Sequence, residues 1–528
     1  MPSIVLSDIA YTAPDGRELF SHLDLSFGRE RVGLVGRNGT GKSTLLRLVA
    51  GELQPAHGTV SVDGAVAVLR QELQAGPDET VADRFGARAA LAVLARAEQG
   101  EATAQELAEA DWTVEARIEA ALARLGIAVP PQTPLAALSG GQRTRVALAA
   151  LVFRAPDILV LDEPTNNLDR DGRAAVHALL AGWRGGAMVV SHDRELLEAM
   201  DAIVELTSLG ASRYGGCWST YRARKELELD AAQRDLAEAG KQAAEARQAA
   251  QAIAERKARK DGAGRRKAAR GDAPKILLGG MKARSEQTGG AQARLAERQD
   301  SEAQEALEAA RARVEVLTPL SVTLPATVLP AGRTVLALDR VSVGYMPENP
   351  VIGDLSLTIT GPERIALAGP NGSGKTTLLS LIAGKLAPLS GEMRVTERFA
   401  MLDQRVELLD AEATIRDNFR RLNPESSENA CRAALARFMF RADAALQRVS
   451  ELSGGQMLRA GLACALGGPT PPYLLVLDEP TNHLDLDSIA AVEAGLRAYD
   501  GALLVVSHDE AFLAAIGITR RIELPARS

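Results

Sequence analysis

The sequence contains few cysteines and few aromatic residues. Its three cysteines, Cys217, Cys431 and Cys464, lie far apart in the 528-residue chain and in no metal-binding spacing. We therefore expect reduced thiols rather than disulfides or zinc ligands. Aromatic residues make up only 3% of the chain. Together with the abundance of alanine and arginine, this favours long helices over β-sandwiches.

A leader peptide and long apolar runs are also missing. The N-terminal residues MPSIVLSDIA show no charged start followed by an apolar stretch, so we predict no secretory signal. No segment approaches the ~20 apolar residues that cross a bilayer. A net charge of −7 argues against a chain that binds nucleic acid over its whole surface. We expect a cytoplasmic protein with no integral membrane segment.

The most prominent feature of the sequence is an internal repeat. GRNGTGKS begins at Gly36 and GPNGSGKT at Gly369, an offset of 333 residues. LSGGQ has its serine at Ser139 and at Ser453, an offset of 314. The halves are therefore homologous, and the first has about 19 extra residues ahead of its LSGGQ segment.

Short apolar runs in each half predict buried parallel strands. RVGLVG and RIALAG run directly into glycine loops, while DILVLDEP, YLLVLDEP, AMVVSHD and LLVVSHD end in polar residues. This alternation with helical stretches is typical of a doubly wound α/β domain, with ligands at the carboxyl ends of the strands. Residues 75–135 and 407–450 predict a smaller helical subdomain in each half. We place the domains at 1–221, 222–332 and 333–528.

The segment between the halves predicts an α-helical hairpin. Leu229, Ala232, Leu236, Ala239, Ala243, Ala246, Ala250 and Ile253 are spaced alternately by three and four residues. That is a heptad seam with small side chains, which suits close packing of two helices. We expect an outgoing helix over 222–260, a tip near 261–290 and a return helix over 291–317.

The predicted tip of the hairpin is strongly basic. Residues 255–284 contain eleven Lys or Arg against three acidic residues, in a chain that is acidic overall. A basic loop on a stiff arm suits a phosphate-rich partner, whereas a solubilising spacer would not explain the one-sided charge. The candidate RNA-binding residues are Arg256, Lys257, Arg259, Lys260, Arg265, Arg266, Lys267, Arg270 and Lys275.

Both glycine loops match the phosphate-binding pattern G-x-x-x-x-G-K-[ST]. Their backbone N–H groups would surround a phosphate, and the following helix would add its positive N-terminal end. The lysine would contact the β- and γ-phosphates, and the hydroxyls of Ser43 and Thr376 would bind Mg²⁺. The predicted ATP-binding residues of the two loops are Gly36, Asn38, Gly39, Gly41, Lys42, Ser43 and Thr44, and Gly369, Asn371, Gly372, Gly374, Lys375, Thr376 and Thr377.

Two acidic residues end a predicted buried strand in each half. Asp162 and Asp478 would hold Mg²⁺, directly or through water. The adjacent Glu163 and Glu479 are placed to orient and deprotonate an attacking water. Paired acids at a buried strand end are costly unless a cation lies nearby, which argues against simple helix caps.

The order of these motifs resembles the ATP-binding cassette ATPases over roughly 1–220 and 333–528. The resemblance implies ATP and Mg²⁺ as ligands, and two cassettes packed head to tail. It pairs Lys42 with 453–456 and Lys375 with 139–142. It also implies glutamines that sense Mg²⁺ and water, γ-phosphate switch histidines and tyrosines that stack on adenine. The residues with these implied roles are Gln71, Gln404, His192, His508, Tyr11 and Tyr345, with Ser139, Gly140, Gly141, Gln142, Ser453, Gly454, Gly455 and Gln456 as the signature segments.

Among cassette proteins, the chain resembles the F subfamily. Transporters need membrane spans, chromosome-structuring ATPases need a much longer spacer, and excision-repair cassettes need zinc-binding cysteines. The resemblance implies a ribosome-associated ATPase that aims its linker at the peptidyl-tRNA and rRNA. An ATPase subunit of a separate membrane exporter and a DNA-associated ATPase are the alternatives. A translation factor and an antibiotic-resistance protein both fit the sequence.

The expected mechanism is a switch in a monomer whose two cassettes pair within one chain. Two ATP molecules would close the cassettes for ribosome binding, and hydrolysis would release them. Asp169 and Asp485 are expected at the interface between the cassettes. The acidic octets DEPTNNLD (162–169) and DEPTNHLD (478–485) differ only at Asn167, where the second has His483. This difference spares the catalytic positions, and it is either neutral or a source of inequality between the sites.

Overall fold

The computed structural model describes residues 2–70, 76, 78–207, 210–269, 295, 298–311, 323–482 and 484–525. The chain divides into two compact units. One contains both halves of the repeat, residues 1–219 and 320–528, and the other is the linker, residues 220–319. The domain borders that we place at 221/222 and 332/333 remain predictions.

Each half begins with a three-stranded antiparallel sheet. In the first half, β1 (Ser3–Thr12) lies between β2 (Glu18–Phe27) and β4 (His57–Asp63). In the second half, β10 (Thr334–Val343) lies between β11 (Ile352–Thr360) and β13 (Ser390–Val395). Inward-facing apolar residues of these strands pack on the helix that follows the glycine loop.

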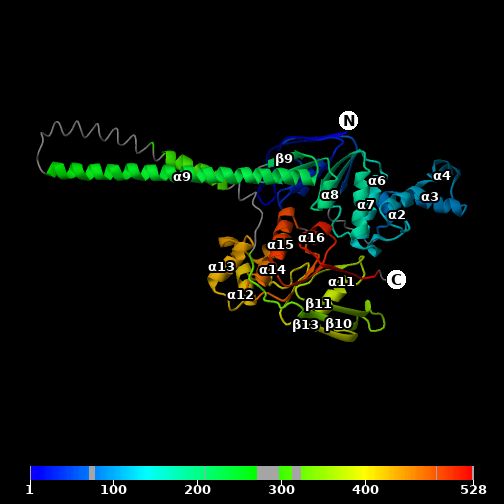
Figure 1. Ribbon diagram of the computed structural model, residues 1–528. Helices are drawn as coiled ribbons and strands as arrows, with labels where there is room; N and C mark the ends of the chain where they lie inside the picture. Colours follow the sequence, from blue (N-terminus) through cyan, green and yellow to red (C-terminus); the bar gives the residue numbers. More distant parts are fainter. Residues whose placement is uncertain are drawn as a thin grey trace. The chain divides into compact units, whose positions relative to one another are not determined.

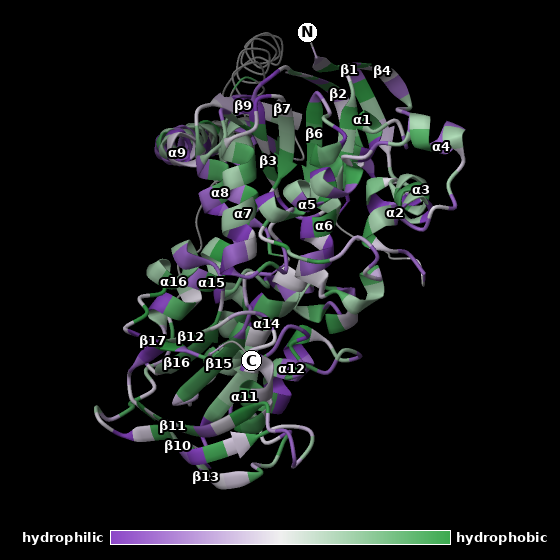
Figure 2. Cartoon of the chain, turned by 90° about the vertical axis from the view of Figure 1, so that its right-hand side faces the viewer, coloured by the Kyte–Doolittle hydropathy of each residue, from purple (hydrophilic) through white to green (hydrophobic). Residues whose placement is uncertain are grey.

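A mostly parallel sheet forms the centre of each half. The first has the order β5-β6-β7-β3-β8-β9, and the second β14-β15-β16-β12-β17. Figure 2 shows the inner strands of these sheets, such as β3 and β6, as hydrophobic, as expected for strands buried on both faces. The strands are β3 (Arg31–Gly36), β5 (Val66–Leu69), β6 (Ile158–Asp162), β7 (Gly186–Val190), β8 (Ala202–Thr207) and β9 (Gly210–Gly215), then β12 (Arg364–Ala368), β14 (Phe399–Leu402), β15 (Leu474–Asp478), β16 (Ala502–Val506) and β17 (Arg520–Glu523).

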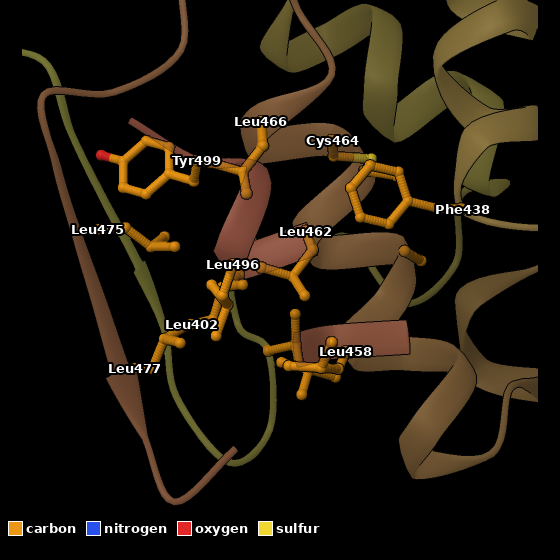
Figure 3. Packing of buried hydrophobic residues seen from close by; sticks show 14 of the residues in the cluster. Leu402, Phe438, Leu458, Leu462, Cys464, Leu466, Leu475, Leu477, Leu496 and Tyr499 are labelled. Carbon is orange, nitrogen blue, oxygen red and sulfur yellow. The ribbon is translucent and has the colours of Figure 1, made fainter. Parts of the chain in front are cut away.

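Helices surround these sheets and form the predicted helical subdomains. In the second half, helices α12 to α15 pack with β14 and β15 into one apolar cluster, shown in Figure 3. Phe438, Leu462 and Tyr499 are among its buried side chains. The helices are α1 (Lys42–Val49), α2 (Val81–Phe85), α3 (Arg88–Glu98), α4 (Ala104–Glu109), α5 (Val114–Arg124), α6 (Gly140–Phe153), α7 (Arg170–Ala181) and α8 (Arg194–Glu198), then α11 (Lys375–Ile382), α12 (Ile415–Leu422), α13 (Glu428–Arg437), α14 (Gly454–Leu466), α15 (Leu486–Ala498) and α16 (Glu510–Ala515).

The linker contains one very long helix. Helix α9 (Trp218–Ala269) has 52 residues, about 78 Å at 1.5 Å per residue, and Figure 1 shows it as a continuous rod. Its buried positions follow the predicted heptad seam, with Ala232 and Ala243 most deeply covered. Leu307, on a returning helical segment over 298–311, lies 3.9 Å from a β-carbon built on Gly240.

The outgoing helix differs from its predicted bounds. It begins four residues before 222 and continues through 261–269, which we assigned to the tip. Alanine, lysine and arginine dominate this extension and favour helix, and this outweighs the cost of about 1 kcal/mol for each of its two glycines. Residues 270–290 of the predicted tip and 291–294 of the predicted return helix lie outside the described residues. Among the described helices, none combines the length and apolar character that a bilayer crossing requires.

Candidate active sites

The first glycine loop connects β3 to α1 in a conformation that requires glycine. Gly41, which precedes α1, has φ 95°, in the left-handed region. A β-carbon built on Gly41 would lie 2.6 Å from Phe20 Cζ, so the loop could not accept a larger residue there without moving the ring. The loop leads directly into the N-terminus of the eight-residue helix α1. Free backbone N–H groups at a helix N-terminus suit a bound phosphate.

The second loop repeats this geometry, and the two lysines occupy equivalent places. Gly374 also has φ 95°, and its built β-carbon would lie 2.9 Å from Val351 Cγ1. Lys42 Nζ donates to the Gly36 carbonyl at 2.6 Å, and Lys375 Nζ to the Gly369 carbonyl at 2.7 Å. Burial lowers the pKa of both lysines, while nearby carboxylates act in the opposite direction. Each lysine ammonium is thus held by the backbone carbonyl of the first glycine of its loop.

The two acidic pairs stand at the carboxyl ends of β6 and β15, beside the loops. Glu163 and Glu479 have φ 49° and 46°, which is uncommon for residues other than glycine. Burial raises the pKa of Glu163 to about 8 and that of Glu479 to about 7. A carboxylate whose pKa lies near neutrality is a more effective proton acceptor than an exposed one, which suits the predicted role as general base.

A histidine contacts each of these glutamates. His192 Nε2 lies 3.1 Å from Glu163 Oε1, and His508 Nε2 lies 3.5 Å from Glu479 Oε1. Burial lowers the pKa of His192 to about 3 and that of His508 to about 4, so both imidazoles are neutral at physiological pH. A neutral imidazole carries a single N–H donor, which can bind either the carboxylate or a phosphate oxygen, as a switch between the two would require.

The residues beside each loop fit a magnesium ion. Burial raises the pKa of Asp162, and a hydrogen bond with the Ser43 hydroxyl acts against that rise. Mg²⁺ in proteins is bound through one or two carboxylates together with phosphate oxygens and water. Among the described residues, no group of three or more His, Cys, Asp or Glu side chains is arranged to hold a metal ion. Ser43 and Asp162, and Thr376 and Asp478, would hold the ion, which would neutralise phosphate charge.

Of the two predicted glutamine ligands, only Gln404 lies within the described residues. Gln404 is exposed in a turn that follows β14. Gln71 lies outside the described residues, and so does His483. The metal-ligand roles of both glutamines remain predictions.

A cavity of about 400 Å³ adjoins the first loop. Glu163 and His192 line it, as predicted for the catalytic centre, and so do Arg17 and Leu19 of the turn before and the start of β2. Tyr11 does not line the cavity; it is half-buried in β1, and Tyr345 is 69% exposed. Arg17 was not predicted, because a single exposed arginine in a turn carries no sequence signal. Adenine stacking by the tyrosines remains a prediction.

Contacts between the halves bring parts of each next to the glycine loop of the other. Asn38 N donates to Asp485 Oδ2 at 2.7 Å, and Arg37 Nε donates to Asp487 Oδ2 at 2.7 Å. A β-carbon built on Gly141 would lie 3.8 Å from Asn371 Nδ2 of the second loop. The LSGGQ segment of the first half therefore lies against the second loop, as the head-to-tail arrangement predicts for that site.

The two LSGGQ serines also begin the helices that follow them. The hydroxyls of Ser139 and Ser453 accept from the backbone N–H groups of Gln142 and Gln456, forming capping boxes. Each hydroxyl keeps its own proton for donation to a further acceptor. The predicted contact of 453–456 with the first nucleotide remains a prediction.

Only part of the candidate RNA-binding surface is described. Arg256 and Arg259 are exposed on α9. Arg270 and Lys275 lie outside the described residues, as do the side chains of Lys257, Lys260, Arg265, Arg266 and Lys267. RNA contact by this set remains a prediction.

Two glycine loops, each beside an acidic strand end and a switch-like histidine, together with two LSGGQ helices, define an ATP-hydrolysing enzyme with tandem ATP-binding cassettes. The family model described as "ABC transporter" matches residues 21–166 and 352–482. The chain belongs to this family, and within it to the F subfamily, ABC-F. The predicted fold class is thereby confirmed.

Relatives match the chain over nearly its whole length. The tylosin resistance ATP-binding protein TlrC of Streptomyces fradiae is 35% identical, with 94% of this chain and 92% of TlrC covered. The energy-dependent translational throttle protein EttA of Mycobacterium tuberculosis is 31% identical, with 92% and 84% covered. The archaeal ribosome recycling factor aABCE1, solved with the ribosomal stalk protein aP1, has a TM-score of 0.56 at 19% identity, covering 98% of this chain and 87% of its own. That likeness shows the fold alone.

Proposed function

We propose that this protein is a ribosome-associated ATPase. ATP binding would close the two cassettes and favour the ribosome-bound state, and hydrolysis would open them and release the protein. The observation that carries this proposal is the pair of cassettes joined by a long helical linker, in a chain that matches a translational throttle protein over 92% of its length. A cytoplasmic location follows from this partner.

The contacts between the halves support the closure step. Each glycine loop lies beside residues of the other half, so a nucleotide bound there would contact both cassettes. Mg²⁺ is proposed with each ATP, at Ser43 with Asp162 and at Thr376 with Asp478. Glu163 and Glu479 are proposed to accept the proton of the attacking water, and His192 and His508 to contact the γ-phosphate. The basic residues around α9 are proposed to contact rRNA or peptidyl-tRNA.

The test replaces both proposed bases. In the Glu163→Gln/Glu479→Gln double variant the carboxylates are lost while the side-chain size is kept, so ATP should bind without being hydrolysed. We expect this variant to co-sediment with ribosomes in the presence of ATP and to inhibit translation. Sedimentation free of ribosomes would contradict the proposal. Recovery of the protein with membranes, or nuclease-sensitive recovery with DNA, would instead favour an exporter subunit or a DNA-associated ATPase.

A resistance role is a second candidate. It is favoured by the match to a tylosin resistance protein, which covers 92% of that relative. Expression of the wild-type chain in a susceptible strain should then raise the inhibitory concentration of tylosin, whereas the double variant should not. Unchanged susceptibility to a panel of ribosome-targeting drugs would contradict the resistance role and favour a role in translation.

A further inference from the structure

A buried ion pair joins the two cassettes beside the first ATP site. Arg194 begins α8, two residues after His192, and its Nη1 lies 2.7 Å from Oε1 of Glu493 in α15 of the second cassette. The two side chains are only 12% and 7% exposed. Substituting one partner would leave a buried charge unpaired, so the pair specifies how α8 and α15 meet when the cassettes are together.

Helix α15 thus contacts the first ATP site at two places. At its N-terminal end, Asp485 accepts from Asn38 N and Asp487 accepts from Arg37 Nε, both at 2.7 Å. Six residues after Asp487, Glu493 accepts from Arg194. A single helix of the second cassette therefore connects the glycine loop of the first site to the loop that carries its histidine. Figure 2 shows α8 of the first cassette facing α15 and α16 of the second.

The repeat does not reproduce this pair at the second site. Counted from the matching aspartates Asp162 and Asp478, Arg194 is equivalent to Glu510 and Glu493 to His177. Glu510 pairs with Arg521, and His177 Nε2 lies 3.2 Å from Asp193 Oδ2; both contacts stay within one cassette. In the described part of the chain, no ion pair crosses between the cassettes at the equivalent position.

A second arginine of the first cassette makes the interface still less symmetric. Arg173 Nη1 lies 3.6 Å from Asp193 Oδ2, with side chains 15% and 6% exposed, and the equivalent position is Ile489. Burial raises the pKa of Asp509 in the second cassette, and the charges of Arg173 and Arg194 act against that rise. Both arginines that act on Asp509 thus come from the first cassette.

We propose that Arg194 and Glu493 are positioning residues, which couple closure of the cassettes to the geometry of the first ATP site. With the pair intact, α15 holds the His192 loop where His192 meets Glu163. When the cassettes open, the pair breaks and the loop is released. Among the described residues the second site has no equivalent ion pair, so the two sites differ at this contact. This inference concerns ATP hydrolysis and does not depend on the proposed ribosomal partner.

The first measurement is steady-state ATP hydrolysis by the full-length chain. Arg194→Gln and Glu493→Gln should each lower kcat about fivefold with KM within about twofold, because positioning for hydrolysis is lost while the glycine loops are unchanged. The charge-reversed double variant Arg194→Glu/Glu493→Arg should recover at least half of the lost rate. The matched control is Glu510→Gln, which breaks an ion pair at the equivalent position within one cassette and should leave kcat unchanged.

The second measurement is amide hydrogen exchange with Mg²⁺ and a non-hydrolysable ATP analogue. Arg194→Gln should speed exchange about tenfold in residues 190–198 and leave residues 506–514 within about twofold. Arg194→Lys, which keeps the charge, should exchange like the wild type and so separates positioning from misfolding. Equal loosening of both segments, or failure of the charge-reversed variant to recover activity, would overturn the proposal.

Discussion

At the residue scale, the backbone of the two proposed bases is fixed by its neighbours. Glu163 N donates to the Val190 carbonyl and Glu479 N to the Val506 carbonyl, each at 2.9 Å. These carbonyls end the strands that lead to His192 and His508. The left-handed φ of each glutamate is therefore held by the strand that carries its histidine partner. Local strain at this position is a feature that both cassettes keep.

Arg17 offers a test of what lines the first nucleotide cavity. Its guanidinium lies near the glycine loop, with Nη1 3.5 Å from a β-carbon built on Gly39. Arg17→Ala should weaken ATP binding at the first site by ~1 kcal/mol, about fivefold, because a charge-assisted contact to phosphate is lost. The measurement is titration with a fluorescent ATP analogue in a Lys375→Ala background, which leaves the first site.

The control for Arg17 is Arg29→Ala, since Arg29 is also exposed but does not line the cavity. Arg29→Ala should leave the affinity unchanged. An equal loss of affinity when Arg17→Ala is placed in a Lys42→Ala background would contradict the assignment to the first site.

Asn167 tests whether the difference between the acidic octets matters. The residue is exposed, has φ 60°, and approaches Gly141 through its backbone carbonyl. Histidine tolerates this left-handed conformation, so Asn167→His should leave hydrolysis unchanged within about twofold. Asn167→Val should destabilise the loop by roughly 1–3 kcal/mol, because a β-branched residue is strained there. ATPase rates and thermal unfolding distinguish the two; a large loss of activity in Asn167→His would give this position a functional role.

At the element scale, periodic patterns were the most predictable features. The heptad seam of the linker, from Leu229 to Ile253, coincides with the covered face of α9, because side-chain packing along a helix depends only on local spacing. The end of α9 was less predictable, since the cost of two glycines had to be weighed against strong helix formers. Arg17 and the Arg194–Glu493 pair could not be predicted, because they depend on segments that meet only in the folded chain.

The close packing of the linker gives a prediction for α9 itself. Ala243 is 3% exposed within the seam, whereas Ala249 is exposed. Ala243→Leu should lower the free energy of local opening by about 1–3 kcal/mol, because the larger side chain has no room against the returning segment. Amide hydrogen exchange of α9 peptides measures this change. Ala249→Leu should leave exchange unchanged, and equal effects of the two substitutions would contradict the packing.

At the scale of the whole molecule, each glycine loop lies against residues of the other half of the same chain. Asn38 with Asp485 and Gly141 with Asn371 are each more than 200 residues apart. Because the pairing occurs within one molecule, the ATPase rate per molecule should not depend on protein concentration. Steady-state assays over about a hundredfold range of concentration check this. A rate that rises with concentration would show that cassettes of different molecules pair.

The single Arg194–Glu493 pair has a consequence for how such a protein can evolve. In a dimer of identical cassettes, every substitution is inherited by both sites, so each contact across the interface occurs twice. Fusing the cassettes into one gene removes that constraint. Position 194 can then be an arginine while its equivalent, Glu510, keeps the opposite charge. Duplication thus gave selection two separate sites to adjust, and one could become slow and the other fast without any new fold.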